Sequence, residues 1–370
     1  MSARRWLMQR LPLVISWPLV AERIGLHGTR VTAITETALG HAIELELQPN
    51  NSVVRVGMMA DQLAVAFGIA RVRVLADPLY SHRVTVLLDQ QLSIGSVPYQ
   101  PEHNPAGLPL NPLRPMPIGL DDNGDEVATS FYGQSILIGG NPGSGKSVAM
   151  RVLLAGLAAS RNVSLVGIDP KHAELTMWAP RFDRLVLGNE VEPTVALLTE
   201  LLTEVQLRAE YLATTSSATL KPSNTHPWIV LVIDEWAETG AAGDQKQRNH
   251  INELLRRYLS LGRAVGCTAI LCTQRPTSDT VDTGTRTLTT HRFAMKCGDR
   301  HQAEAILGVG AFVPDQLLSA SPGRALWSNG GPAVAVQFAN LSDEQIPLVL
   351  CPTFRTLYEP PMTSTAKDFF

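Results

Sequence analysis

Gly140-Asn141-Pro142-Gly143-Ser144-Gly145-Lys146-Ser147 is the stretch of this chain that decides its fold. It follows the apolar run 135–138 and opens a run with helical spacing, 147–159. Glycines in such a turn let backbone N–H groups curl around phosphate oxygens, and the helix start adds positive potential. The pattern predicts a nucleotide site with contacts from Gly140 to Val148, where Lys146 reaches the β- and γ-phosphates of ATP and Ser147 offers a hydroxyl to Mg²⁺.

A second signal lies farther along the chain, where the apolar run 228–233 ends in Asp234-Glu235. Two carboxylates at the end of a buried strand are costly unless they hold a cation or polarise water. We expect Asp234 to bind Mg²⁺, directly or through water, and Glu235 to orient and activate the attacking water. A strand cap would be the alternative if the phosphate loop were absent.

Short apolar runs alternate with helical runs from residue 135 onward. Runs of this kind at 135–138, 163–168, 229–233 and 268–272 are typical of strands buried on both faces, with helices at 147–159, 192–212 and 249–261 between them. The order predicts an α/β fold with a mainly parallel sheet and helices on both sides. Upstream, two β-rich runs at 31–48, a helix at 56–67 and strands at 71–75 and 83–88 predict a small α/β domain.

These patterns suggest five segments. They are an N-terminal segment at 1–27, the small α/β domain at 28–97, a linker with seven prolines at 98–117, a P-loop domain at 118–351 and a polar tail at 352–370. The first segment carries arginines before a short apolar run that contains prolines, so we expect a docking segment or a peripheral membrane contact on a cytoplasmic protein.

The composition is that of a globular chain able to bury a core, with 45% hydrophobic and 18% charged residues. There are 31 basic and 34 acidic residues, and the net charge of −3 argues against a generally basic nucleic-acid coat. DNA held by a few loops in a channel stays compatible with it. The four cysteines have no zinc-binding spacing, which favours reduced thiols.

Two further runs follow strands of the predicted sheet. Thr273-Gln274-Arg275-Pro276 would lie at the ligand edge of the sheet, where Gln274 can sense the γ-phosphate or position water; a plain strand-end turn is the alternative. For Asp169-Pro170-Lys171-His172-Ala173-Glu174-Leu175, a salt-bridged structural turn and a direct catalytic role stay equally open, and we interpret His172 as a loop residue.

Together these segments resemble the FtsK/SpoIIIE family of DNA translocases. The Gly-Ser-Gly-Lys-Ser of the loop, Asp-Pro-Lys-x-x-Glu-Leu at 169–175, Asp234-Glu235 and the run from Arg263-Ala264-Val265-Gly266 to Gln274-Arg275-Pro276 occur in that family's order. The resemblance covers roughly residues 28 to 350. The compact form and Trp178-Ala179-Pro180 look most like conjugal transfer proteins of actinomycete plasmids and integrated elements.

The resemblance implies a RecA-like P-loop NTPase core in a ring hexamer, with ATP between subunits and double-stranded DNA in the channel. It implies an arginine from the neighbouring subunit at the phosphates, for which Arg263 is the first choice and Arg256, Arg257 and Arg292 are alternatives. Relative to the cell-division members, we expect neither the membrane-spanning N-terminal domain nor the C-terminal winged helix in this chain. Membrane anchoring and sequence recognition would then come from elsewhere, for example from a membrane or cell-division partner protein, or would not occur.

DNA contacts should be made to the backbone, because a translocase must accept any sequence. The segment 279–290, with Thr283, Gly284, Thr285 and Arg286, matches the family's channel loop, and Lys246 and Arg248 lie in a second candidate loop. A solvated surface residue stays an equal alternative at each position.

The leading hypothesis is an ATP-driven pump for double-stranded DNA in conjugative transfer or chromosome partitioning. The alternative from another class is a type VII secretion-like ATPase that moves protein substrates, whose motors share this core. A third is a binding module with a decayed nucleotide site, against which the intact Lys146, Ser147, Asp234 and Glu235 argue.

Overall fold

The chain divides into two units in a computed structural model. The smaller unit comprises residues up to Ile94 together with Asp122–Asp125, and the larger comprises Gly95–Asp121 and Glu126–Phe370. The structure describes residues 16–37, 39–77, 79–90, 97–99, 110–215, 217–277, 280–309, 317, 320–331 and 333–350. The first fifteen residues of the predicted docking segment, half of the predicted linker and the whole predicted tail lie outside these ranges.

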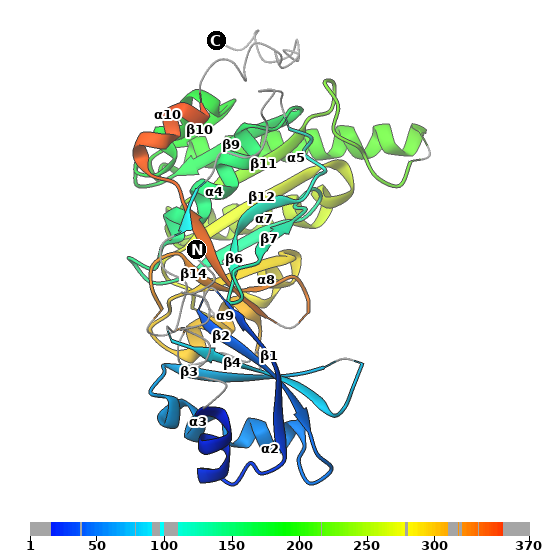
Figure 1. The fold of residues 1–370 in the computed structure, drawn as a ribbon. Coiled ribbons are helices and arrows are strands. Elements are labelled where there is room, and N and C mark those ends of the chain that lie inside the picture. Colours follow the sequence, from blue (N-terminus) through cyan, green and yellow to red (C-terminus); the bar gives the residue numbers. More distant parts are fainter. Residues whose placement is uncertain are drawn as a thin grey trace. The chain divides into compact units, whose positions relative to one another are not determined.

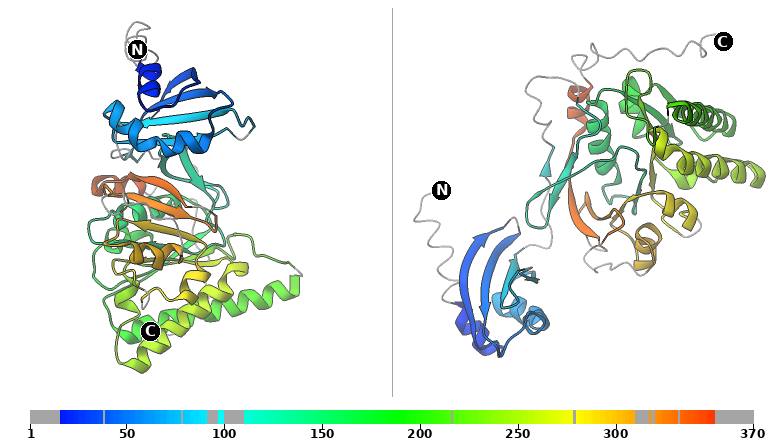
Figure 2. Two further views of the ribbon diagram at one scale, coloured as in Figure 1. Left: turned by 90° about the horizontal axis from the view of Figure 1, so that it is seen from below. Right: turned by 90° about the vertical axis from the view of Figure 1, so that its right-hand side faces the viewer.

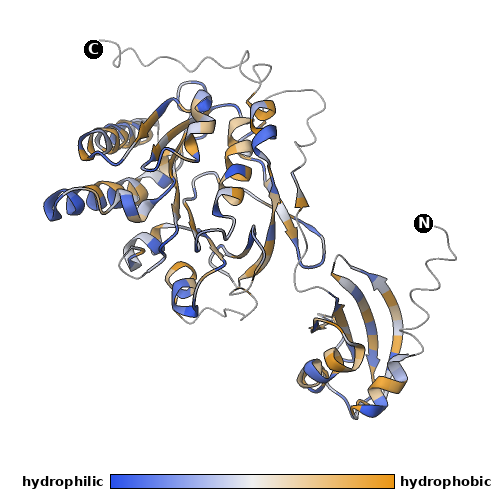
Figure 3. Ribbon diagram, turned by 90° about the vertical axis from the view of Figure 1, so that its left-hand side faces the viewer, coloured by the Kyte–Doolittle hydropathy of each residue, from blue (hydrophilic) through white to orange (hydrophobic). Residues whose placement is uncertain are grey.

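The smaller unit is a four-stranded antiparallel sheet with helices against it (Figure 1). Its strands lie in the order β1-β2-β4-β3, and Figure 3 shows hydrophobic and hydrophilic residues alternating along them. The predicted helix at 56–67 is two helices, because the chain breaks at Met59. Residues 16–23 are helical, and the named elements are β1 Thr29–Glu36, β2 Gly40–Leu47, α2 Val53–Met58, α3 Ala60–Phe67, β3 Arg71–Ala76 and β4 Arg83–Asp89.

The larger unit is built on one long sheet. Its strands follow the order β10-β9-β11-β12-β8-β13-β14-β15-β6-β7, with β5 paired to β15. Neighbours from β10 to β13 are parallel and those from β13 to β7 are antiparallel, so the predicted mainly parallel α/β fold is confirmed. The strands are β5 Val97–Pro98, β6 Met116–Asp121, β7 Glu126–Thr129, β8 Ile136–Gly139, β9 Val163–Asp169, β10 Arg184–Leu187, β11 Trp228–Ile233, β12 Cys267–Thr273, β13 His291–Met295, β14 Arg324–Ser328 and β15 Val334–Asn340.

Helices cover both faces of this sheet. Along β11 the side chains alternate: Ile229, Leu231 and Ile233 join the core with α5, α7 and α9, whereas the residues between them join the core with α4 and α10. Figure 2 shows α5 and α7 side by side. The helices are α4 Lys146–Ala158, α5 Val191–Thr215, α6 Trp236–Thr239, α7 Gln245–Gly262, α8 Thr283–Leu288, α9 Arg300–Leu307 and α10 Ile346–Val349, with 3₁₀ turns at Leu175–Arg181, Arg263–Val265 and Asp343–Gln345.

Four adjacent parallel strands bring the sequence motifs together. In the sheet order β9-β11-β12-β8, these strands end at Asp169, Ile233, Thr273 and Gly139. Because parallel strands share one carboxyl edge, the segments that follow them meet there. The edge therefore carries the phosphate loop, Asp234-Glu235, Gln274 and the turn that begins at Asp169.

Candidate nucleotide-binding site

The loop between β8 and α4 has the backbone that a phosphate cradle needs. Gly143 and Gly145 adopt left-handed conformations, with φ of 75° and 94°, which glycine adopts at little cost. A Cβ on Gly145 would also collide with the backbone of Gly323, whose N–H donates to the Ser144 carbonyl at 2.9 Å. The turn before strand β14 therefore supports the loop from one side, and these positions require glycine.

Two features of the loop fit a phosphate group. The first-turn N–H groups of α4, at Lys146, Ser147 and Val148, have no acceptor within the helix and carry its positive end. The Ser144 hydroxyl is buried without a hydrogen-bond partner among the residues described. Unmet donors around a glycine-rich turn are what an anionic oxygen satisfies, so the residues present fit the phosphates of a nucleotide.

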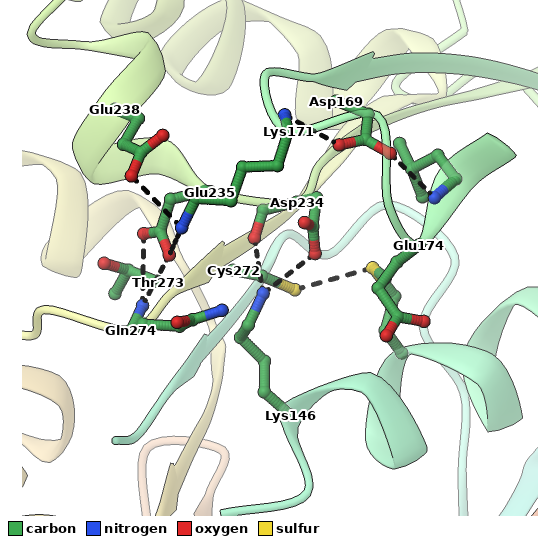
Figure 4. A network of polar contacts seen from close by, with 12 residues as sticks. Lys146, Asp169, Lys171, Glu174, Asp234, Glu235, Glu238, Cys272, Thr273 and Gln274 are labelled. Carbon is green, nitrogen blue, oxygen red and sulfur yellow. Dashed lines mark hydrogen bonds and ion pairs between the residues drawn. The ribbon is translucent and has the colours of Figure 1, made fainter. Parts of the chain in front are cut away.

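Lys146 forms a buried ion pair with Asp234 (Figure 4). Its Nζ donates to Asp234 Oδ1 at 2.8 Å and to the Asp234 carbonyl at 2.7 Å, and both residues are almost fully buried. Burial by itself lowers the pKa of Lys146, but Cys272, Asp234 and Glu235 outweigh it and the net shift of this pKa is upward. Burial raises the pKa of the Cys272 thiol to about 12. This thiol is therefore neutral at pH 7, and the two carboxylates keep Lys146 charged.

Glu235 lies next to this pair, with 1% of its surface exposed. Both of its carboxylate oxygens accept from the backbone N–H of Gln274, each at 3.1 Å. The end of β12 thereby holds the carboxylate that follows β11. Gln274 makes this contact through its backbone, which leaves its half-buried side chain available at the edge of the site.

The turn after β9 is tightly hydrogen-bonded. The buried carboxylate of Asp169 accepts from the N–H groups of Lys171 and Leu175, at 3.1 and 3.0 Å. The Lys171 side chain lies between Glu235 and Glu238, with Nζ 3.6 Å from Glu235 Oε2 and 3.1 Å from Glu238 Oε1. Sequence reasoning missed this link. The signal that could have found it is that Asp-Pro-Lys and Asp-Glu both follow apolar runs, which become neighbouring strands.

Magnesium needs few protein ligands in a phosphate site, because phosphate oxygens and water complete its shell. Ser147 begins α4 directly after Lys146, and Asp234 is the partner of Lys146, so both candidate ligands belong to the same edge of the sheet. Within the described ranges, no group of three or more His, Cys, Asp or Glu side chains could hold a metal ion by itself. Cys267, Cys272 and Cys297 are buried free thiols.

The candidate arginines lie in different places. Arg263 is exposed at the amino end of β12, opposite the edge that carries the phosphate loop of the same subunit. Arg256 and Arg257 are exposed on α7. Arg292, on β13, donates to the Leu307 carbonyl at 2.9 Å, and burial followed by the charge of Arg286 lowers its pKa. Arg263 therefore does not reach the phosphate loop of its own chain from this end of the sheet.

The candidate DNA residues lie mainly on helices, which corrects their assignment to loops. Lys246 and Arg248 are exposed in the first turn of α7, because Asp244 and Gln247 form a capping box that starts the helix. The segment 279–290 contains α8, in which Thr285 is buried, with 3% of its surface exposed. Arg286 donates to the Ala305 carbonyl at 3.3 Å. Residues 278 and 279 lie outside the described ranges.

Among the described residues, no helix is long and apolar enough to cross a membrane.

Comparison with known proteins gives one family. The model of the FtsK/SpoIIIE family matches residues 114–225. The DNA translocase FtsK of Listeria monocytogenes is 24% identical over 338 residues, which are 85% of this chain and 44% of that protein. The DNA translocase FtsK of Lactiplantibacillus plantarum is 29% identical over 315 residues, which are 75% of this chain and 38% of that protein. The chain thus spans less than half the length of these relatives.

Solved structures share the fold. The monomer form of the pCW3 conjugation coupling protein TcpA with ATPγS has a TM-score of 0.61 and 18% identity, covering 91% of this chain and 98% of that one. The cytoplasmic domain of the type VII secretion ATPase EccC of Thermomonospora curvata has a TM-score of 0.54 and 24% identity, covering 70% and 33%. The family match covers the phosphate loop and the turn after β9, so the resemblance read from the motifs is confirmed: residues 114–225 of this chain match the FtsK/SpoIIIE family.

Proposed function

We propose that this chain hydrolyses ATP at the edge formed by β8, β9, β11 and β12, and that it uses the energy to move double-stranded DNA. The observation that carries the proposal is the buried Lys146–Asp234 pair, with Glu235 held beside it at the phosphate loop. A buried ion pair is weak evidence for stability alone. Here the pair lies next to hydrogen-bond donors of the phosphate loop that lack acceptors, so a bound nucleotide can take over Lys146 as a partner.

The pair implies an exchange of partners on nucleotide binding. Lys146 Nζ leaves the Asp234 carboxylate and donates to the β- and γ-phosphates, while the loop N–H groups hold the remaining oxygens. Asp234 and the Ser147 hydroxyl are then free to hold Mg²⁺. When bound, Mg²⁺ would neutralise charge that develops on the phosphate oxygens.

Glu235 has the position of a water-orienting base. Its carboxylate is buried and held by the Gln274 backbone, so it can face the γ-phosphate side of the edge without rotating freely. Such a base contributes about 10² to 10⁴ in rate. The Gln274 side chain is the candidate γ-phosphate sensor.

We infer that an arginine from the neighbouring subunit of a ring hexamer completes the site at the phosphates, with Arg263 as the first choice. Support comes from its exposure at the sheet end opposite its own phosphate loop. A mixing experiment tests this. Arg263→Ala protein and Lys146→Ala protein are each expected to be inactive, but mixed rings contain some interfaces with both residues intact. Recovered ATP turnover supports action between subunits, and a mixture as inactive as its components contradicts it.

The DNA assignment rests on the family match and on the FtsK relatives, which are named as DNA translocases. Conjugative transfer or chromosome partitioning would be the setting, with the N-terminal segment as the docking or peripheral membrane contact. Exposed Lys246 and Arg248 on α7 are the candidate backbone contacts. A type VII secretion-like role is the competing assignment, since such an ATPase shares the fold.

ATP turnover is the test that separates these assignments. We expect the purified protein to hydrolyse ATP faster when linear duplex DNA is added, with a stimulation that weakens as salt rises. Lys146→Ala should abolish turnover with and without DNA. Turnover that ignores DNA at every salt concentration, but rises with a small secreted helical protein, would reverse the assignment in favour of protein transport.

A further inference from the structure

Lys171 connects a buried carboxylate with one that faces solvent. Its Nζ is 3.6 Å from Glu235 Oε2 and 3.1 Å from Glu238 Oε1 (Figure 4). The Glu235 side chain is 2% exposed, whereas those of Lys171 and Glu238 are 35% and 39% exposed. An exposed lysine would be expected to stay in water, paired with Glu238 alone. Its reach to Glu235 therefore needs a reason.

The turn that carries Lys171 is built to hold it. Asp169 is completely buried, and its carboxylate accepts the N–H of Lys171 itself. His172, the next residue, has a φ of 55°, a left-handed conformation that costs a non-glycine residue about 1 kcal/mol or more. A surface turn with no positioning task needs neither a buried carboxylate nor this backbone. Both features fix the point from which the Lys171 side chain starts.

The charged groups around Glu235 indicate a role for Lys171. Asp234 and Glu235 are consecutive buried carboxylates, and Lys146 forms its ion pair with the first. In the part of the chain that the structure describes, the ion pair recorded for Glu235 is the one with Lys171. Once Lys146 turns to the phosphates, Lys171 is the cation that stays with Glu235. A buried carboxylate that loses its cation is strongly destabilised and tends to move toward water.

We propose that Lys171 is a positioning residue for Glu235, which keeps the carboxylate under the Gln274 N–H through the ATPase cycle, and that Glu238 holds the outer end of Lys171. This inference rests on the proposed function, because it takes Glu235 as the group that orients the attacking water.

The test measures kcat, KM and nucleotide affinity for the full chain and a set of variants. Lys171→Met should lower kcat about 10- to 100-fold, which is part of the 10² to 10⁴ that the base supplies, and leave KM and the affinity for ATP within about 2-fold. Lys171→Arg keeps the charge and should recover kcat to within about 5-fold. Lys221→Met, at an exposed lysine outside the site, is the matched control and should behave as wild type.

A double variant distinguishes positioning from general damage. If Lys171 acts through Glu235, adding Lys171→Met to Glu235→Gln should lower kcat no further, because the group it positions has already gone. Urea unfolding of the nucleotide-free proteins, run in parallel, reports any loss of stability separately from turnover.

Several results would overturn the inference. They are a wild-type kcat in Lys171→Met, a loss that adds fully to that of Glu235→Gln, or a change in KM with kcat unaltered. If Lys171→Met does not fold, Lys171→Gln and Lys171→Arg decide instead, and equal kcat in these two would show that the charge is not used. A wild-type protein without ATP turnover would refute the proposed function itself, and the inference with it.

Discussion

Removing the Lys146 ammonium group should make the larger unit easier to unfold even when no nucleotide is present. The change is Lys146→Met, which leaves Asp234 at 2% exposure without the ammonium group now 2.8 Å from its Oδ1. Breaking a buried pair by removing one partner typically costs about 3 to 5 kcal/mol. For a domain of this size, that corresponds to a fall in Tm of about 6 to 20 °C.

The double variant Lys146→Met/Asp234→Asn makes this prediction specific. With both charges gone, no uncompensated ion remains, so we expect most of the lost stability to return, to within about 1 kcal/mol of wild type. Urea unfolding without nucleotide measures the free energy of unfolding of the wild type, of Lys146→Met, of Asp234→Asn and of the double variant, with Lys221→Met as the control for loss of a surface lysine. Wild-type stability in Lys146→Met, or a double variant as unstable as the sum of the two single variants, would refute the reasoning.

Three other predictions follow from the site and the core. Gly145→Ala should destabilise the protein by at least about 1 to 2 kcal/mol in urea unfolding and abolish nucleotide binding, because φ is 94° and the new Cβ meets the Gly323 backbone; normal ATP binding would contradict this. Glu235→Gln should keep ATP affinity and lower kcat about 10²- to 10⁴-fold, and wild-type turnover would disprove the role of that carboxylate. Burial lowers the pKa of His291 from 6.5 to about 4, so the unfolded chain takes up a proton first as the pH falls. The stability that this residue contributes is complete above about pH 6.5 and is lost toward pH 4, with about 2 kcal/mol gone at pH 5. His291→Gln should lose less stability between pH 8 and pH 5 than wild type does, and an equal loss in both would exclude His291 as the cause.

Local patterns predicted the parallel half of the larger sheet well. The sequence predicts strand β9 at 163–168, and it occupies Val163–Asp169. The prediction works because a strand buried on both faces is a short apolar run, which differs clearly from the polar loops beside it. The antiparallel half was not predicted. Strand β15 pairs with β6, which lies more than 200 residues earlier in the chain, and no local signal specifies such a pairing.

The start of helix α7 at Gln245 could have been predicted from the sequence. Asp244 and Gln247 have the spacing of a capping box, and the structure contains both of its hydrogen bonds. Weighting that signal would have placed Lys246 and Arg248 on a helix from the beginning. The break at Met59 could not be predicted in this way, because the helical spacing of apolar residues continues through it and no capping residue marks it.

The candidate site shows the same division between local and non-local information. Motifs identified Lys146, Asp234 and Glu235, because each residue type has a chemical reason to follow a strand. The contacts of Lys171 depend on which strands are neighbours, and a single sequence does not give the strand order β9-β11-β12-β8. The sequence alone therefore allows a structural or a catalytic role for the turn at Asp169, and the sheet order brings this turn beside Glu235.

Movement along duplex DNA is the central claim, and displacement of a third strand measures it directly. A labelled oligonucleotide is bound as a triplex at one end of linear duplexes of increasing length, and its release is followed after ATP addition. We predict release that requires ATP hydrolysis, is absent with Glu235→Gln, and begins after a lag that grows with the length of duplex ahead of the triplex. ATP turnover without release, or release with a lag that does not depend on length, would contradict the account.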